Sequence, residues 1–144
     1  MRIELFNLKT HRFNELVYDN EFSKLGDSLT NFVFSLALTK IFNRYEGVRV
    51  SNFVLSEALK KSTFNYLIKK RQNRHEKGNI VESIILFSWV KEYFEILDLV
   101  KLLSERISSS TNRVRQKEIY IHAYVYLLDT IQKKLSQHGE ILAD

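Results

Sequence analysis

Residues 21–44 read EFSKLGDSLTNFVFSLALTKIFNR, and this stretch decides the fold. Apolar side chains recur in it at spacings of three and four residues, which is the period of an α-helix with one apolar face. The members of this stripe are Phe22, Leu25, Leu29, Phe32 and Leu36. We therefore predict one long helix over residues 21–44.

The opposite side of this predicted helix changes character along its length. It begins with Asn20, Ser23 and Asp27 and becomes apolar at Phe34 and Leu38. A helix that is apolar on more than one side packs against more than one partner. We therefore expect this helix to be buried on two faces.

Gly26 lies inside the same helical pattern, directly before Asp27. Glycine in a helix interior costs about 1 kcal/mol relative to alanine. Its presence here indicates that another part of the backbone approaches closely at this point.

The next predicted elements are two short helices. Ser51 is a good N-cap for a helix that ends at Lys61, and a second helix is predicted from Thr63 to about Arg71.

Two longer helical stretches follow. Asn79 and Glu82 form an N-x-x-E capping box, which predicts a nearly continuous apolar helix from Ile80 to about Phe94. The pattern allows the chain to continue helically over residues 97–107. A last helix is predicted from about Val114 to Leu135, where Ile119, His122, Ala123 and Tyr126 keep an apolar spacing, with Gly139 as a stop.

The composition of the chain agrees with an all-α fold. The 144 residues contain no proline, no cysteine and four glycines, and long helices avoid proline. The length fits a single domain over residues 1–144, without disulfides or thiolate metal sites. No apolar run reaches the roughly 18 residues that span a bilayer, and the first ten residues lack a secretory apolar region. We expect a cytoplasmic protein without a membrane partner.

The net charge of +5 is concentrated in residues 60–77, KKSTFNYLIKKRQNRHEK. This segment has seven basic residues and one acid, Glu76, so the net charge of the segment exceeds the net charge of the whole chain. A solvated helix face explains such a run, and so does contact with a polyanion, because clustered cations displace counterions from phosphates. Charge alone does not separate RNA from DNA, a membrane surface or an acidic protein as the partner. The candidate polyanion-binding residues are Lys60, Lys61, Lys69, Lys70, Arg71, Arg74 and Lys77.

Catalytic motifs built on a protein nucleophile are absent from the sequence. His11, His75, His122 and His138 lack ligand spacing, and we interpret His122 as flanking the core and the others as surface residues.

The remaining candidates are two acids on two apolar helices, Asp27 and Glu82. They are able to share a divalent cation such as Mg2+, which prefers oxygen ligands. Alternatively, Glu82 only closes the capping box and Asp27 only lies on a polar face.

Residues 22–29 read FSKLGDSL, and residues 78–85 read GNIVESII. The first stretch is similar to the signature helix of the ribonuclease III family, and the second resembles that family's second motif, D-x-x-E-A-x-I. Between them, residues 50–59 resemble the family's intervening helix. The likeness covers about 18–95, leaves the helices within 96–137 unassigned, and is nearest in style to short archaeal-type and mini-ribonuclease III proteins.

The resemblance implies an all-α, homodimeric endonuclease domain that cuts double-stranded RNA with Mg2+, or with Mn2+ in its place. Asp27 and Glu82 match the family's catalytic metal ligands. The family's dimer joins through the signature helix, here residues 21–44, which would account for the second apolar face at Phe34 and Leu38. No double-stranded RNA-binding domain is expected in the C-terminal third, so RNA contact would rest on residues 60–77.

The site departs from the family pattern at three positions. Family acids are replaced by Asn20, Ser23 and Asn79, which offer neutral oxygens as further metal ligands. Glu21 is one place off and is expected to point away from the Asn20 direction.

Three hypotheses follow from the sequence. The first is a metal-dependent endoribonuclease that acts in RNA processing. The second is a weakened ribonuclease III-like dimer that serves as an RNA-binding or scaffold protein. The third discards the resemblance in favour of a helical interaction protein, and it predicts that Asp27 and Glu82 do not approach each other.

Overall fold

The computed structural model describes residue 2 and residues 12–142, and these contain helices and no strand. The elements are α2 (Phe13–Leu16), α3 (Asn20–Phe42), α4 (Asn52–Lys61), the 3-10 turn η1 (Asn65–Leu67), α5 (Arg74–Val90), α6 (Ile96–Ser104) and α7 (Arg113–Gln137). The all-α prediction is confirmed for this part of the chain. None of the described helices is long and apolar enough to cross a membrane.

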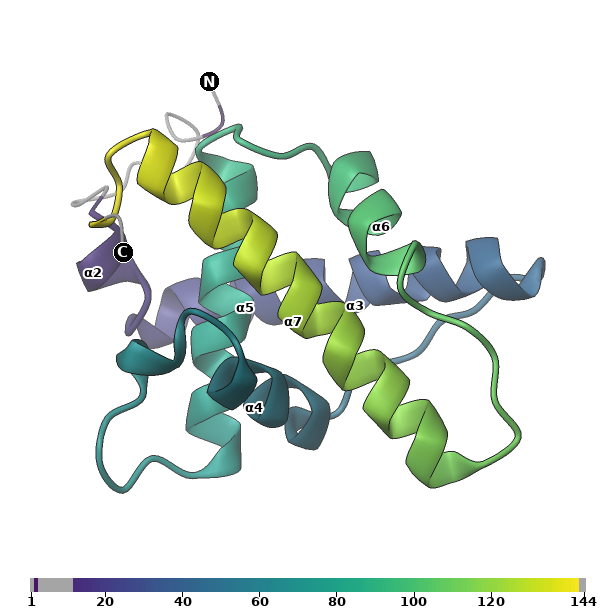
Figure 1. Cartoon of the computed structure of the whole chain (residues 1–144). Helices are drawn as coiled ribbons and strands as arrows, with labels where there is room; N and C mark the ends of the chain where they lie inside the picture. Colours follow the sequence, from purple (N-terminus) through teal and green to yellow (C-terminus); the bar gives the residue numbers. More distant parts are fainter. Residues whose placement is uncertain (1, 3–11, 143–144) are drawn as a thin grey trace.

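Helix α5 is the centre of the molecule. It packs against α3, α4 and α7, and α6 rests on α3 and α7 (Figure 1). Every residue from Ile80 to Ser88 is buried. The continuous apolar run of α5 therefore reflects burial on all sides rather than a single apolar face.

The apolar stripe predicted to bury α3 faces partly outward instead. Leu25 is 45% exposed and Phe32 is 52% exposed. The predicted second face is inside the subunit, where the Phe34 ring packs edge-on against Tyr120 of α7 at 5.1 Å between ring centroids. Phe34 and Leu38 are thus core residues, and the expectation that they form a dimer surface is wrong.

Helix α5 begins six residues earlier than the sequence pattern predicts. Asn73 is the N-cap and Glu76 completes the capping box, with the Glu76 amide donating to Asn73 Oδ1 at 2.8 Å. Asn79 and Glu82 consequently lie within the helix, so the prediction that they cap it is wrong. The helix ends at Val90 rather than near Phe94.

The short elements agree with the sequence in part. Ser51 caps α4 through the Val54 amide, as predicted. The helix predicted from Thr63 to Arg71 is reduced to η1, and Arg71 has a left-handed φ of 67°. Helix α7 begins and ends within about a turn of its predicted bounds, and Gly139 follows it with φ of 71°.

A row of polar side chains along α3, which we call the ladder, binds residues 46–50, which follow this helix. Asn31, Ser35 and Thr39 recur every four residues, so their side chains share one side of the helix. Ser35 Oγ donates to the Val48 carbonyl and accepts from its amide, and Thr39 Oγ1 accepts from the Glu46 amide at 2.9 Å. The returning segment therefore runs back along α3 towards its first half.

Candidate functional site

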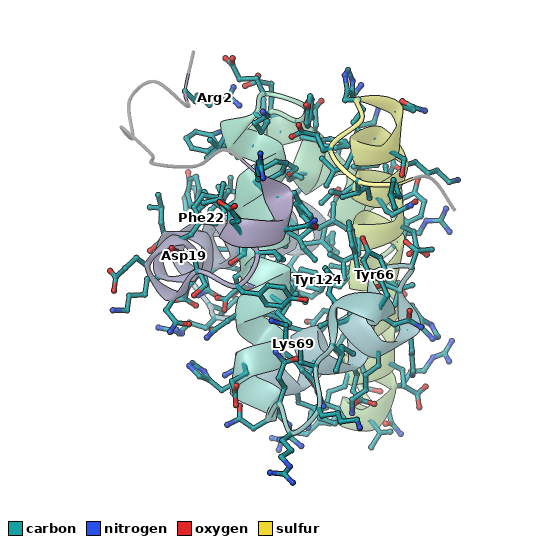
Figure 2. All side chains as sticks on the ribbon, turned by 90° about the vertical axis from the view of Figure 1, so that its left-hand side faces the viewer. Arg2, Asp19, Phe22, Tyr66, Lys69 and Tyr124 are labelled. Atoms are coloured by element: carbon teal, nitrogen blue, oxygen red, sulfur yellow. The ribbon has the colours of Figure 1, made fainter. Side chains whose placement is uncertain are left out.

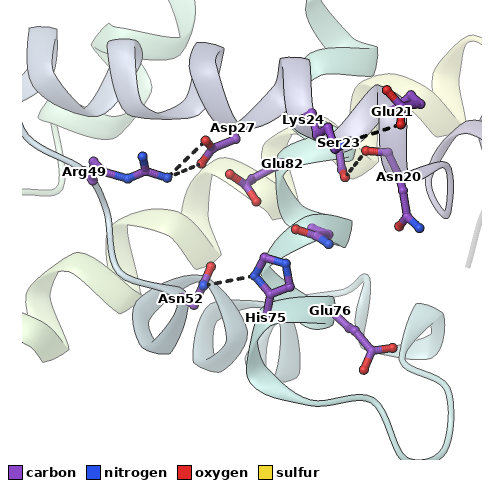
Figure 3. Close-up of a pocket in the computed structure, with 11 residues that line it drawn as sticks. Asn20, Glu21, Ser23, Lys24, Asp27, Arg49, Asn52, His75, Glu76 and Glu82 are labelled. Carbon is purple, nitrogen blue, oxygen red and sulfur yellow. Dashed lines mark hydrogen bonds and ion pairs between the residues drawn. The ribbon is translucent and has the colours of Figure 1, made fainter.

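Helices α3 and α5 cross in contact at Gly26. A Cβ atom built on Gly26 would lie 2.4 Å from the carbonyl oxygen of Glu82 and 2.7 Å from its carbonyl carbon. This is the close backbone approach that the sequence predicts at Gly26. Because the helices meet here, Asp27 and Glu82 become neighbours (Figure 3).

Glu82 is a buried acid beside another acid. Only 4% of the residue is exposed. Burial raises the pKa of the Glu82 carboxyl from 4.5 to about 9, helped by a hydrogen bond with Asp27 and by the Asp27 charge, and opposed by the Arg49 charge. Without a bound cation, Glu82 therefore carries a proton at neutral pH. The expectation of the third hypothesis, that the two acids stay apart, is wrong.

A buried tyrosine without a hydrogen-bond partner in the described part of the chain lies near Glu82. Tyr124 of α7 is fully buried, and its hydroxyl has no hydrogen-bond partner among the described residues. Burial, followed by the charge of Glu82, raises the pKa of Tyr124. A negative charge on Glu82 is thus costly unless a cation approaches from the open side.

Asp27 is the better solvated of the two acids and has polar partners. Arg49 Nη2 contacts Asp27 Oδ1 and Oδ2 at 3.2 and 3.1 Å, and Asn31 Nδ2 donates to Oδ1 at 3.0 Å. Asn31 Oδ1 in turn accepts from the Val50 amide at 2.9 Å. The same side chain therefore orients Asp27 and anchors the segment that carries Arg49.

An open pocket of about 700 Å³ surrounds the two acids. All five candidate metal ligands line it: Asn20, Ser23, Asp27, Asn79 and Glu82. Ser23 is buried and donates from Oγ to the Asn20 carbonyl at 2.9 Å. Glu21 lies at the rim and pairs with Lys24 at 3.2 Å.

The pocket also includes residues that no sequence motif singles out, namely Lys24, Arg49, Asn52, His75 and Glu76. Asn52 Nδ2 lies 3.4 Å from His75 Nδ1. A Cβ atom on Gly78 would lie 2.6 Å from Asn52 Oδ1, so glycine leaves the notch in α5 that Asn52 occupies. The N-terminal end of α4 is thereby docked beside the pocket.

The oxygen donors of the pocket fit a hard divalent cation. Among the described residues, no group of three His, Cys, Asp or Glu side chains lies close enough to hold a metal ion. The donor set is two adjacent carboxyls with neutral amide and hydroxyl oxygens nearby. Mg2+ is typically held by one or two carboxylates and keeps several waters, and Arg49 already occupies a cation position against Asp27.

The basic residues 60–77 lie on three elements. Lys60 and Lys61 end α4, Lys69 to Arg71 are in the following loop, and Arg74 and Lys77 belong to the start of α5. All seven are exposed except Lys77, which is half-buried. Lys60 pairs with Glu57 at 2.7 Å, so part of its charge is neutralised.

Lys69 connects the basic loop to the pocket. Its Nζ lies 3.8 Å from the ring centroid of Tyr18. Lys69 lines a smaller pocket of about 180 Å³ together with Asp19, Asn20 and Asn79, and Figure 2 labels Lys69 and Asp19 on the side of the molecule that faces the viewer. Asn20 and Asn79 also line the main pocket. The loop therefore borders the site that holds Asp27 and Glu82.

A further cation joins this basic surface from α7. Two cations lie over the ring of Phe53 on α4. Arg74 Cζ of α5 is 5.0 Å from the ring centroid, and Lys117 Nζ of α7 is 5.6 Å from it. Lys117 is 40 residues away from the basic run, so charge counting along the sequence cannot associate the two.

Within the described part of the chain, His122 and His138 do not join any cluster of His, Cys, Asp or Glu side chains that could hold a metal ion. His122 is exposed rather than core-flanking, and the ring of His138 stacks on Tyr93 at 4.5 Å between centroids. His11 lies outside the described residues.

The family model described as Ribonuclease III matches residues 20–137. The chain belongs to the ribonuclease III family. No curated protein matches the chain. The match runs beyond the 18–95 likeness and includes α6 and α7, for which the sequence offered no family motif. Membership of the ribonuclease III family gives the protein a ribonuclease-related role, in a family that acts on double-stranded RNA and generally depends on divalent metal ions.

Proposed function

We propose that the protein is a cytoplasmic, metal-dependent endoribonuclease that cleaves double-stranded or structured RNA during RNA processing. One observation carries this proposal: Asp27 and Glu82 lie next to each other at the Gly26 helix crossing, on the wall of an open pocket. Two acids so close repel each other when both are ionised, and this repulsion makes a cation-binding position.

Asp27 and Glu82 would be the charged ligands of Mg2+ or Mn2+, and Asn20, Ser23 and Asn79 the neutral oxygen donors. The ion would supply Lewis-acid stabilisation of the phosphate and activation of a water molecule. Glu82 must give up its proton to act as a ligand, so cation binding releases a proton. Asp27 remains oriented by Asn31 during this exchange.

The RNA would lie across the cationic surface beside the pocket, formed by Lys60, Lys61, Lys69, Lys70, Arg71, Arg74, Lys77 and Lys117. A-form RNA is recognised mainly through its shape, phosphates and 2′-hydroxyls, which exposed lysine and arginine side chains contact. Within the described part of the chain, Arg74 and Lys117 pack on the Phe53 ring and form no ion pair with a carboxylate, so their charges are available for phosphates.

We also infer that the protein is a homodimer joined through α3. The surface available for this contact is the stripe with Leu25 and Phe32 exposed and Leu29 and Leu36 half-buried. Phe34 and Leu38 do not contribute, because they are buried within the subunit.

A cleavage assay with a long RNA duplex tests the proposed activity. Wild-type protein is expected to cut the duplex with Mg2+ or Mn2+ and to be inactive with EDTA. Glu82→Gln and Asp27→Asn should each lose this activity, while Glu105→Gln, at an exposed acid outside the pocket, should keep it. Equal cleavage by wild type and Glu82→Gln would contradict the site assignment.

A second candidate function is a dimeric RNA-binding or scaffold protein without catalysis. It is favoured by the neutral residues Asn20, Ser23 and Asn79, which leave two carboxyls in the site. This function predicts salt-sensitive duplex binding with no cleavage under any divalent ion, and no Mn2+ at Asp27 and Glu82 in a soaked crystal.

A further inference from the structure

We propose that Arg49 is a phosphate-binding residue of this site, held against Asp27 in the metal-free protein and turned to the RNA phosphate when a divalent ion binds. This inference rests on the proposed function, because it assumes that Asp27 receives the ion. It adds a residue outside both family motifs, and it predicts opposite effects on ion binding and on RNA cleavage.

The position of Arg49 is fixed by the ladder along α3. Its neighbour Val50 is bonded to Asn31, and its neighbour Val48 is bonded twice to Ser35. Three hydrogen bonds thus anchor the backbone on both sides of Arg49. This anchoring keeps the start of the Arg49 side chain beside the pocket that it lines.

The side chain of Arg49 is fixed much less firmly. It is 77% exposed, and its hydrogen bonds to the described residues run from Nη2 to the two oxygens of Asp27. Within the same part of the chain, Nε and Nη1 make no hydrogen bond. An arginine with free donors at the mouth of a pocket is suited to phosphate, which it binds through two parallel hydrogen bonds.

The contact with Asp27 places one positive charge where the divalent ion would bind. Both cations are drawn to the same carboxylate, so they repel each other within a few ångströms. Entry of the ion therefore weakens the hold of Asp27 on Arg49. The freed guanidinium remains at the pocket mouth because the ladder holds its backbone, and an RNA phosphate there offers a new partner.

Two consequences of opposite sign follow from removal of this charge. Without RNA, Arg49→Gln should bind Mn2+ more tightly by about three- to tenfold, since a competing cation is gone. With RNA, the same variant should lose about ten- to a hundredfold in kcat/KM, the usual worth of a charged hydrogen bond to phosphate. If Arg49 only supported the local structure, Arg49→Gln would weaken both Mn2+ binding and RNA cleavage.

The experiment compares wild type, Arg49→Gln, Arg49→Lys and Arg44→Gln. Arg44 is the matched control, because it is an exposed arginine of the same segment that pairs with Glu46 rather than Asp27. Mn2+ binding is titrated by electron paramagnetic resonance without RNA, and duplex cleavage is measured at saturating Mn2+. Thermal melting in EDTA checks that each variant is folded.

The inference requires tighter Mn2+ binding and weaker cleavage for Arg49→Gln, partial recovery of cleavage for Arg49→Lys, and wild-type behaviour for Arg44→Gln. It is overturned if wild type binds Mn2+ and cleaves RNA while Arg49→Gln does both equally well, or does both less well. If wild type neither binds Mn2+ nor cleaves the duplex, the proposed function fails and this inference fails with it.

Discussion

Gly26 of α3 lies in direct backbone contact with Glu82 of α5. The space for a Cβ atom on Gly26 is taken by the Glu82 carbonyl, 2.4 Å away. Backbone atoms have no rotamer by which to move aside, so only glycine permits this crossing. The same crossing places the neighbouring Asp27 beside the Glu82 side chain. The geometry of the site therefore depends directly on how closely α3 and α5 pack.

The first prediction concerns this contact. Gly26→Ala should force α3 and α5 apart, lowering the free energy of unfolding by about 2 kcal/mol, as overpacked cores do. Duplex cleavage should fall further than stability alone explains, because Asp27 moves away from Glu82. Denaturant unfolding and a cleavage assay below the melting range measure the two effects.

Gly47→Ala is the matched control for this substitution. Gly47 lies in the exposed returning segment, and a Cβ atom there meets nothing within 4 Å. It should leave both stability and cleavage close to wild type. Wild-type stability in Gly26→Ala would show that the helices tolerate the added methyl group.

The second prediction is a pH dependence of stability in the absence of metal. The Glu82 carboxyl has a pKa of about 9 in the folded state and about 4.5 when unfolded. Between these values the folded state holds a proton that the unfolded state releases, so stability falls as pH rises. Chemical unfolding in EDTA from pH 5 to pH 9 should show this decline.

Glu82→Gln should abolish this decline, because an amide does not titrate. The variant should be more stable than wild type in EDTA at pH 8, and only wild type should gain stability when Mg2+ is added. The same downward slope in both proteins would assign the titration to another group.

The start of α5 illustrates what the sequence leaves undecided. Asn73-Arg-His-Glu76 and Asn79-Ile-Val-Glu82 both have the N-x-x-E pattern of a capping box. The structure uses the first pair, which is exposed, and buries the acid of the second. Local pattern alone cannot choose between two equal caps, because the choice depends on how α3 packs over residues 78–88.

The same limit applies to α3 and to Arg49. Periodicity identifies two apolar faces on α3, but it does not say which one the rest of the chain covers. Gly26 does indicate the close contact, because glycine in a helix interior lowers helix stability and is kept where a larger residue does not fit. Arg49 was missed since it lies 22 residues from Asp27, although a polar residue at every fourth position from Asp27 to Thr39 was a visible signal.

The third prediction adds a carboxylate to the pocket. Asn79 lines both pockets and stands where the family motif has aspartate. Asn79→Asp should bind Mg2+ about tenfold more tightly and reach full activity at a lower Mg2+ concentration, because a charged ligand replaces a neutral one. Calorimetric Mg2+ titration checks this, and unchanged affinity would place Asn79 outside the ion's ligands.

The fourth prediction concerns the cationic surface at Phe53. The double variant Arg74→Gln, Lys117→Gln should weaken duplex RNA binding, because two cations no longer face the phosphates. The slope of log Kd against log salt should become shallower by about one for each phosphate that the variant no longer binds. Binding is measured by fluorescence anisotropy at several salt concentrations. Lys133→Gln, an exposed lysine towards the other end of α7, is the control and should keep the wild-type slope.

The last prediction tests the dimer on the corrected face of α3. Phe32 is 52% exposed and belongs to the stripe with Leu25. In a twofold dimer each substitution enters the interface twice, so Phe32→Asp would place two buried charges in an apolar contact. Light scattering should show wild type as a dimer and Phe32→Asp as a folded monomer. Leu97→Asp, at a 75% exposed leucine of α6, should remain dimeric, and a monomeric wild type would contradict the dimer altogether.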